Sequence, residues 1–260
     1  MKKDLTEKDG RLILLLTLLG AFAAVVMIPY PKGIGLLDIL IETYHISFTI
    51  AAIINVIQVT LYTLIASAIG LHLARRVGFN VSYLRGLVYK NKTVPLSLKW
   101  IMIAILGSAV GTLIIAVLEV KVFQPHLVTQ LVPNVSLWKI GLLMFYGGIV
   151  EEILLRLFLL SLIVWICSIS YRKQSRPIPK YIYWIAILVS TLLFGLGHLP
   201  ATATVFGEIT SLLFIRAIVL NGLMGVFFGY LFWKKGLEYA IIAHMLGDVF
   251  LHVVWHSLFT

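Results

Sequence analysis

The sequence predicts an all-α integral membrane protein with about seven transmembrane helices packed in one bundle. Three observations predict this fold class. Hydrophobic residues make up 60% of the 260-residue chain and charged residues only 12%, about half of the charged share of a soluble domain. Apolar runs recur along the chain, each long enough to cross ~30 Å of hydrocarbon. Lysine and arginine collect in alternate connections between these runs, as they do in the cytoplasmic loops of membrane proteins.

The N-terminal transmembrane region is expected in residues 1–137, with three spans and a basic cytoplasmic loop. The first apolar run, residues 12–28, lacks the small-residue cleavage site of a signal peptide, so we interpret it as a retained span near 12–29. The next spans are expected at 48–73 and 100–120. Between them, the segment "GFNVSYLRGLVYKNKTVP" is predicted to contain a short helix at the membrane interface.

The last four spans are expected in residues 138–260, which we interpret as the catalytic transmembrane core. They cover residues 138–170, 181–199, 210–233 and 238–259. The first of them is too long for one straight span, because an α-helix of that length would extend ~50 Å. Gly147 and Gly148 lie within it and mark either a break or a point of close packing.

The net charge of +10 follows the expected topology. With the N-terminus in the cytoplasm, 16 of the 21 lysines and arginines lie on the cytoplasmic side and three on the opposite side, while Arg156 and Arg216 lie within spans. The positive-inside rule predicts this orientation, and we place the protein in a bacterial plasma membrane. The basic loops are expected to contact anionic lipid and not nucleic acid. The single cysteine, Cys167, excludes an intramolecular disulfide and a cysteine-based metal cluster.

Three charged residues interrupt the apolar stretch "IVEEILLRLF", which covers residues 149–158. Ionisable groups at membrane depth are costly, so they usually face the bundle interior and serve a function. On an α-helix, Glu152 and Arg156 share a face and can form an ion pair. Glu151 lies about 140° round from Arg156 in the same geometry. We therefore predict that Arg156 neutralises Glu152, while Glu151 faces a cavity as a general base.

Two further spans carry histidines that can join this carboxylate. His198 ends the segment "LLFGLGHLP", and His244 and Asp248 lie four residues apart on one helical face in "IIAHMLGDVF". One carboxylate and two histidines, Glu151, His198 and His244, supply the ligand types of a zinc site. The same groups can also activate water and stabilise an oxyanion without a metal. His198 lies ~27 Å along its helix from Lys180, so a common site requires that this span tilts or begins later.

Each of these signals also has a structural interpretation. A single membrane histidine more often bonds a neighbouring helix than it catalyses a reaction, and Glu152 with Arg156 can act only as structural glue. Arg216 can pair with Glu208 or extend to the outer interface. We assign purely structural roles to the remaining histidines and to three glycines of the sixth span. These residues are His45, His72, His126, His252, His256, Gly222, Gly225 and Gly229.

The three motifs together resemble a known family. "EEILLR", "FGLGH" and "HMLGD", in this order and each on a span, are similar to the EExxxR, FxxxH and HxxxN/D motifs of the CPBP family, which contains the CAAX proteases and the bacteriocin-processing (Abi) proteins. The resemblance covers residues 138–255 and implies an all-helical membrane bundle with the active site in its last spans. It implies that Glu151 and His198 activate water and that His244 and Asp248 stabilise the oxyanion or help to hold a metal. Glu152 and Arg156 would support the first motif.

From the residues and the resemblance together, we expect an intramembrane peptidase that hydrolyses a membrane-associated or lipophilic peptide. Glu151 and His198 would activate the water, with or without a zinc ion or another divalent metal. One alternative is a non-proteolytic membrane scaffold or a bacteriocin self-immunity protein, which would keep the motif residues for structure. A second alternative is a proton-coupled transporter that uses the same groups as a relay. The absence of repeat symmetry in the sequence disfavours the transporter.

Overall fold

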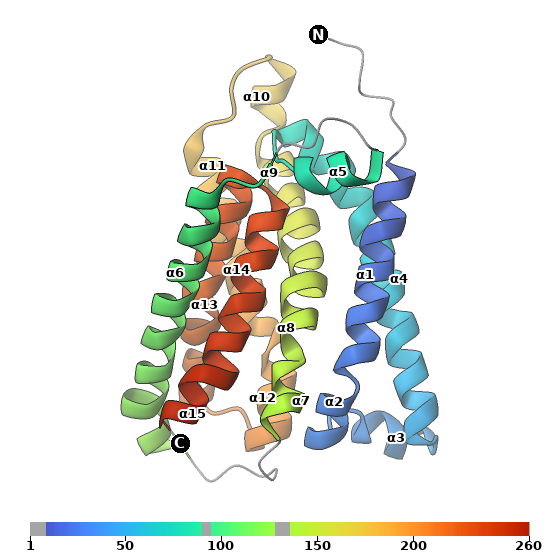
Figure 1. The fold of residues 1–260 in the computed structure, drawn as a ribbon, viewed down its shortest axis with the longest axis vertical. Coiled ribbons are helices and arrows are strands. Elements are labelled where there is room, and N and C mark those ends of the chain that lie inside the picture. The colour runs from blue at the N-terminus through green and yellow to red at the C-terminus, as the bar shows by residue number, and fades with distance from the viewer. Residues whose placement is uncertain (1–8, 90–94, 128–135, 260) are drawn as a thin grey trace.

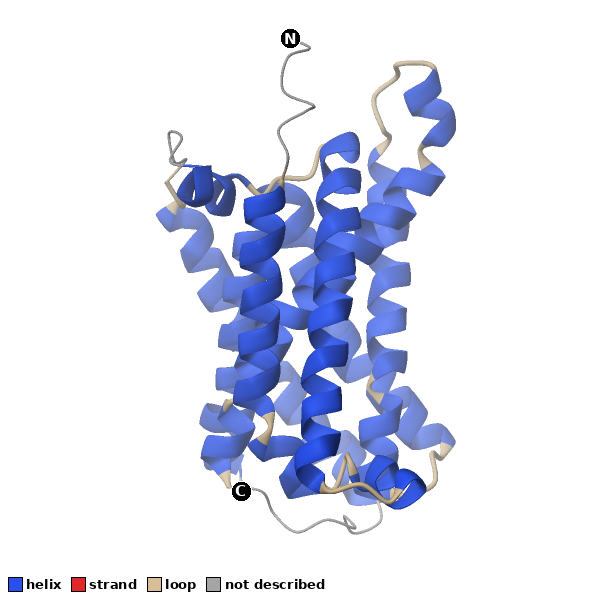
Figure 2. Ribbon diagram, turned by 90° about the vertical axis from the view of Figure 1, so that its right-hand side faces the viewer, coloured by secondary structure: helices blue, strands red, loops and turns tan. Residues whose placement is uncertain are grey.

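The long helices of the protein run roughly parallel in one bundle, with short helices at both ends (Figures 1 and 2). The computed structural model describes residues 9–89, 95–127 and 136–259. Within these residues every regular element is a helix. The expected all-α bundle is therefore confirmed.

The described N-terminal part consists of three long helices and the short helices that flank them. Its elements are α1 (Gly10–Met27), α2 (Pro29–Ile34), α3 (Asp38–Tyr44), α4 (Phe48–Val77), α5 (Ser82–Tyr89), α6 (Leu98–Leu118), η1 (Glu119–Phe123) and η2 (Gln124–His126). Helix α4 begins where the Ser47 hydroxyl accepts a hydrogen bond from the Ile50 amide, and it ends at Gly78, whose φ of 82° suits a glycine. The short helix expected in residues 78–95 is confirmed as α5; residues 90–94 of that segment lie outside the described residues.

The C-terminal part contains the remaining helices. Its elements are α7 (Leu137–Gly141), α8 (Leu143–Phe145), η3 (Tyr146–Leu160), α9 (Ser161–Cys167), α10 (Ile169–Lys173), α11 (Lys180–Gly197), α12 (Leu199–Phe206), α13 (Ser211–Lys235), α14 (Leu237–Val249), η4 (Phe250–Trp255) and α15 (His256–Phe259). The run from α7 to α9 passes from one end of the bundle to the other, with α1 and α4 on one side and α13 and α14 on the other (Figure 1).

Six helical segments of the described residues are long and apolar enough to cross a membrane. They are Gly10–Ile34, Phe48–Val77, Leu98–His126, Lys180–Phe206, Ser211–Lys235 and Leu237–Phe259. The span expected at 138–170 is not among them, because its longest continuous helical stretch, residues 143–167, carries the three charged residues Glu151, Glu152 and Arg156 near its middle. The expected count of seven is thus not confirmed, although the divided run does traverse the bundle (Figure 1).

The basic helix ends lie together at one end of the bundle. Helices α4, α10 and α13 carry lysine or arginine in their last turns, and these turns lie at the upper end in Figure 1. This grouping agrees with the alternation of charge along the chain. The first basic cluster, in residues 1–8, lies outside the described residues. Which side of a membrane the basic end faces stays a prediction.

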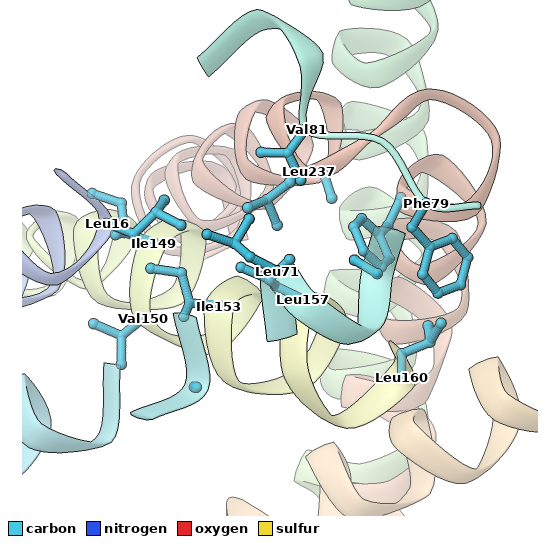
Figure 3. Packing of buried hydrophobic residues seen from close by; sticks show 14 of the residues in the cluster. Leu16, Leu71, Phe79, Val81, Ile149, Val150, Ile153, Leu157, Leu160 and Leu237 are labelled. Atoms are coloured by element: carbon cyan, nitrogen blue, oxygen red, sulfur yellow. The ribbon is translucent and has the colours of Figure 1, made fainter. Parts of the chain in front are cut away.

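The two larger apolar cores of the described residues share the helices α13 and α14. One core joins α1 and α4 to η3 and α11, and Figure 3 shows Leu16, Leu71 and Leu157 within it. The other core joins α6 to α13 and α14. A side chain on Gly70 of α4 would come within 2.8 Å of the Leu157 carbonyl oxygen, so α4 packs against η3 almost backbone to backbone. The first core crosses the boundary at residues 137/138, where the division into two regions stays a prediction.

Arg216 of α13 forms an ion pair near the end of the bundle opposite the basic one. Its Nε and Nη2 atoms donate to the Glu119 carboxylate of η1 at 2.7 and 2.9 Å, which is the bidentate geometry that favours arginine. The guanidinium also lies over the Phe206 ring. The sequence offered Glu208 as the partner of Arg216, and the structure provides Glu119 instead, because η1 continues α6 alongside α13.

Candidate active site

The motif "EEILLR" lies on a wide π-helix, η3, and not on the α-helix expected from the sequence. Backbone bonds of a π-helix join residues five apart, one more than in an α-helix. Each residue therefore turns the helix by a smaller angle, and Glu151 and Arg156 lie closer to one face than the roughly 140° expected for an α-helix. Such helices occur mostly as single turns and often at functional sites, whereas η3 extends over 15 residues. The expected α-helical geometry of this motif is therefore wrong.

Glu152 is fully buried and its carboxylate is shared between two partners. Its Oε1 atom lies 3.2 Å from Arg156 Nη1 and accepts a hydrogen bond from His244 Nδ1 at 2.7 Å. The ion pair with Arg156 that the spacing predicts is present. The bond to His244 joins η3 to α14 across 92 residues of sequence, and the sequence pattern had offered no sign of it.

Arg156 is enclosed by aromatic rings and a backbone carbonyl. Its guanidinium carbon lies 5.0 Å from the ring centroid of Phe194 and 5.5 Å from that of Phe228, distances at which a cation is attracted to a ring. Nη2 donates to the Gly225 carbonyl at 3.2 Å. Among the described residues, Arg156 Nε has no hydrogen-bond partner, and the contact of Nη1 with Glu152 lacks hydrogen-bond geometry. Arg156 is thus held by charge and ring contacts more than by complete hydrogen bonding.

His244 occupies the centre of the cluster. Its ring stacks on Phe228 with centroids 4.3 Å apart. Because Nδ1 is bonded to Glu152, Nε2 is the atom that faces the other carboxyl groups. It lies 3.6 Å from Glu151 Oε2 and 3.8 Å from Asp248 Oδ1. Both distances exceed those of a hydrogen bond, so Glu151 and Asp248 lie near this nitrogen without bonding to it. The Glu151 side chain is 19% exposed, whereas that of Glu152 is fully buried.

His198 approaches the cluster from the end of α11. Its Nδ1 lies 2.9 Å from the Phe194 carbonyl oxygen, which can only accept, so Nδ1 carries the hydrogen and Nε2 is left as the free nitrogen. The Phe194 ring lies between the two histidines, 4.7 Å from the His198 ring and 5.9 Å from the His244 ring. His198 also interacts electrostatically with Asp248. From the sequence, His198 lies too far along its helix to share one site easily with Glu151 and His244. The structure reduces this difference in depth, because a helical side chain leans towards the N-terminus of its helix, here by one turn towards Phe194.

Two glycines allow η3 and α14 to come this close. A side chain on Gly147 would contact the Asp248 carboxylate and would lie 2.9 Å from His244 Nε2. One on Gly148 would run into the Met245 side chain and lie 3.1 Å from the Met245 backbone nitrogen. The helical run continues through both positions. Of the two expected alternatives, a break or close packing, the structure shows close packing.

The expected metal site is not assembled by the described residues. Zinc requires nitrogen or oxygen ligands at about 2.0–2.2 Å in a convergent set, and no three His, Cys, Asp or Glu side chains of the described residues form such a group. The set Glu151, His198 and His244 does not fit a resident metal as it stands, and we assign no step of chemistry to one. Zinc stays a prediction, which metal analysis of the purified protein can decide.

Sequence reasoning missed three contributors to this region. Phe228 stacks on His244 and the Gly225 carbonyl bonds Arg156, although Gly225 had been assigned to helix packing alone. It does pack closely as well, since a side chain there would lie 2.9 Å from Thr191. His252, which had been given a structural role, interacts electrostatically with His198 and His244. Its spacing of four residues from Asp248, which repeats that between His244 and Asp248, was the available signal.

Comparison with known proteins bears on the same region of the chain. Residues 133–250 match a family model described as Rce1-like, type II CAAX prenyl endopeptidase Rce1-like. The matched segment contains Glu151, Glu152, Arg156, His198, His244 and Asp248. No curated protein and no solved structure matches the chain.

Proposed function

We propose that the chain is an intramembrane endopeptidase of the CPBP family, because residues 133–250 match the Rce1-like model of type II CAAX prenyl endopeptidases and the three motifs resemble that family. Its substrate is a membrane-associated or lipophilic peptide or protein. The six apolar helices and the family support an integral membrane protein. The choice of substrate class rests on the position of the site, because a peptide that partitions into lipid reaches a site within the bundle most readily.

One observation carries the proposal: three carboxyl groups and an imidazole from two helices meet inside an apolar bundle. His244 lies within 4 Å of Glu151, Glu152 and Asp248. Purely structural glue would need only Glu152 and Arg156. The partly exposed Glu151 and the free Nε2 of His198 have no such structural task in the contacts described above.

In the proposed reaction, a water molecule is activated by Glu151, which takes one of its protons, with the unprotonated Nε2 of His198 as a second acceptor beside it. The water oxygen bonds the carbonyl carbon of the scissile peptide, whose oxygen becomes an anion. The imidazolium form of His244, whose Nδ1–H is bonded to Glu152, stabilises this oxyanion through Nε2–H, assisted by a protonated Asp248. The carbon–nitrogen bond then breaks, and the leaving amine takes the proton held by Glu151. The products are a carboxylic acid, which still carries the second proton of the water, and an amine; the acid then releases that proton to solvent.

Glu152 and Arg156 are positioning residues in this scheme. The Glu152 carboxylate orients the His244 ring and favours its protonated form by accepting from Nδ1–H. Arg156 offsets the charge of Glu152, and the rings of Phe194 and Phe228 exclude water from both. An environment poor in water strengthens each electrostatic interaction at the reacting atoms.

Replacement of Glu151 by Gln tests the proposal. Wild-type protein in liposomes is expected to cleave members of a panel of fluorogenic peptides, each offered with and without a lipid-modified cysteine. Glu151→Gln keeps the size of the side chain but cannot accept a proton, so cleavage should fall by about 10²–10⁴-fold, the usual contribution of a general base.

Glu42→Gln is the matched control, because Glu42 is exposed on α3 and loses the same charge away from the site. It should cleave like the wild type. Full cleavage by a folded Glu151→Gln protein would refute the assignment of the base. Absence of cleavage by the wild type, together with an unchanged biological output of Glu151→Gln, would favour a membrane scaffold.

A further inference from the structure

A polar cavity of about 300 Å³ opens at the basic end of the bundle, away from the candidate active site. Its walls come from three places: the start of α5, the residues that lead into α6, and the turn between α13 and α14. The lining includes Ser82, Ser97, Trp100, Lys234 and Lys235. Helix α5 lies across this end of the bundle (Figure 1), so the cavity sits where the apolar helices give way to basic connections.

Two lysines and the indole of Trp100 give the cavity positive charge and an aromatic wall. Lys235 Nζ lies 4.4 Å from the ring centroid of Trp100, and both residues line the cavity. Lys234 Nζ lies 3.4 Å from the ring of Trp233. In the described part of the chain, neither lysine forms an ion pair with a carboxylate. Lysine together with tryptophan is the combination found where proteins meet the headgroup layer of a membrane.

The acidic group in the wall is already engaged. Glu238 Oε1 accepts a hydrogen bond from the Leu84 amide in the first turn of α5 at 3.0 Å, so this carboxylate caps α5. Tyr239 is likewise committed, because its hydroxyl accepts from the Ser97 amide at 2.6 Å. The other polar lining residues include Ser82, Ser97 and the two lysines, and their hydroxyl and ammonium groups can donate hydrogen bonds.

The cavity also leads towards lipid. Trp100 and Ile103 of α6 and Phe227 of α13 are half-buried and pack against the same apolar core. Phe227 lies directly on Gly107 of α6. An apolar strip therefore runs from the polar cavity along the junction of α6 and α13 towards the middle of the bundle.

We propose that this cavity binds the phosphate of a phospholipid headgroup, with Lys234 and Lys235 as its charge partners and the acyl chains along the α6–α13 junction. Charge-assisted hydrogen bonds from two ammonium groups suit a phosphate, and basic pockets between membrane helices are known to bind such headgroups. Free phosphate offers the same anion but has no acyl chains that could contact the apolar strip. The proposal does not depend on the proposed peptidase activity.

The test uses the full-length chain, purified in a mild detergent, stripped of lipid and examined by native mass spectrometry. Dioleoyl phosphatidylglycerol is added to the wild type and to the double variant Lys234→Gln/Lys235→Gln. One tightly held lipid per chain is expected for the wild type. The double variant should bind at least about tenfold more weakly, the change that corresponds to the loss of one charge-assisted hydrogen bond. Lys235→Arg keeps the charge and the ring contact, and should bind like the wild type.

Lys139→Gln is the matched control, because Lys139 also lies over a tryptophan, Trp138, but on α7 at the opposite end of the bundle. It should leave binding unchanged. Dioleoylglycerol, which has the same chains and no phosphate, should not bind, and inorganic phosphate should not displace the lipid. Equal binding of the two lipids, displacement by inorganic phosphate, or unchanged binding by the double variant would each overturn the proposal.

Discussion

The described residues contain two arginine–glutamate pairs within the helical bundle, and they differ in a way that separates stability from function. Arg216 and Glu119 form a complete bidentate pair at 2.7 and 2.9 Å, although their side chains are 21% and 27% exposed. Arg156 and Glu152 are fully buried, yet their contact is longer, at 3.2 Å, and lacks hydrogen-bond geometry. The less complete pair is the one whose carboxylate is shared with His244.

The comparison suggests that Glu152 and Arg156 are not optimised as a salt bridge. A buried ion pair offsets its desolvation only when the geometry is good and the remaining atoms are bonded. Here Glu152 Oε2 and Arg156 Nε have no hydrogen-bond partner in the described residues. The incomplete geometry is expected if the hydrogen bond to His244, and not the contact with Arg156, sets the position of the Glu152 carboxylate. The Arg216–Glu119 pair, in contrast, holds α13 to η1.

The largest effect is expected when the buried pair is broken. Arg156→Met leaves the Glu152 charge in an apolar interior without its counter-ion, so the free energy of unfolding should fall by about 3–5 kcal/mol. Thermal unfolding of the purified protein in detergent measures this as a large drop in Tm. A Tm close to that of the wild type would show that Glu152 is not charged in the folded protein, and the comparison of two ion pairs would fail.

A smaller effect, on catalysis, is expected from Glu152→Gln. The amide can still occupy the site but lacks the charge that holds His244, so kcat for peptide cleavage should fall by about 10–100-fold with little change in KM, as for other residues that orient a catalytic group. Peptide cleavage in liposomes gives both constants. An unchanged kcat would show that His244 does not depend on this carboxylate.

The smallest effect is expected at the exposed pair. Arg216→Met removes the bidentate contact, but both side chains reach solvent or headgroups, so the free energy of unfolding should change by about 0–1 kcal/mol and cleavage should be unaffected. Thermal unfolding and the cleavage assay, run beside Arg156→Met, measure both. A loss of stability as large as that of Arg156→Met would remove the distinction between the two pairs.

Much of the fold and part of the site could be predicted from local patterns. Apolar length and the alternation of basic loops indicated the bundle and the grouping of its basic ends. A four-residue spacing indicated that Glu152 and Arg156 pair, and it held although the helix proved to be wider than an α-helix. The motif order placed His198, His244 and Asp248 near these residues.

The rest depends on contacts between distant parts of the chain. The bond from His244 to Glu152 and the ion pair from Arg216 to Glu119 join residues 92 and 97 positions apart, and no local pattern specifies such pairs. The π-helix is a further case, because nothing in "YGGIVEEILLRLFLL" distinguishes it from an apolar α-helix; close packing at Gly147 and Gly148 becomes visible only when α14 is in place. Roles in catalysis stay predictions.

The wide helix η3 also limits how this part of the chain can change in length. Glu151 and Arg156 are separated by one repeat of its backbone bonding. Insertion or deletion of a single residue between them, with a return to α-helical geometry, would turn one of them relative to the other by about 100°. The stretch can therefore exchange its apolar side chains far more readily than it can gain or lose a residue.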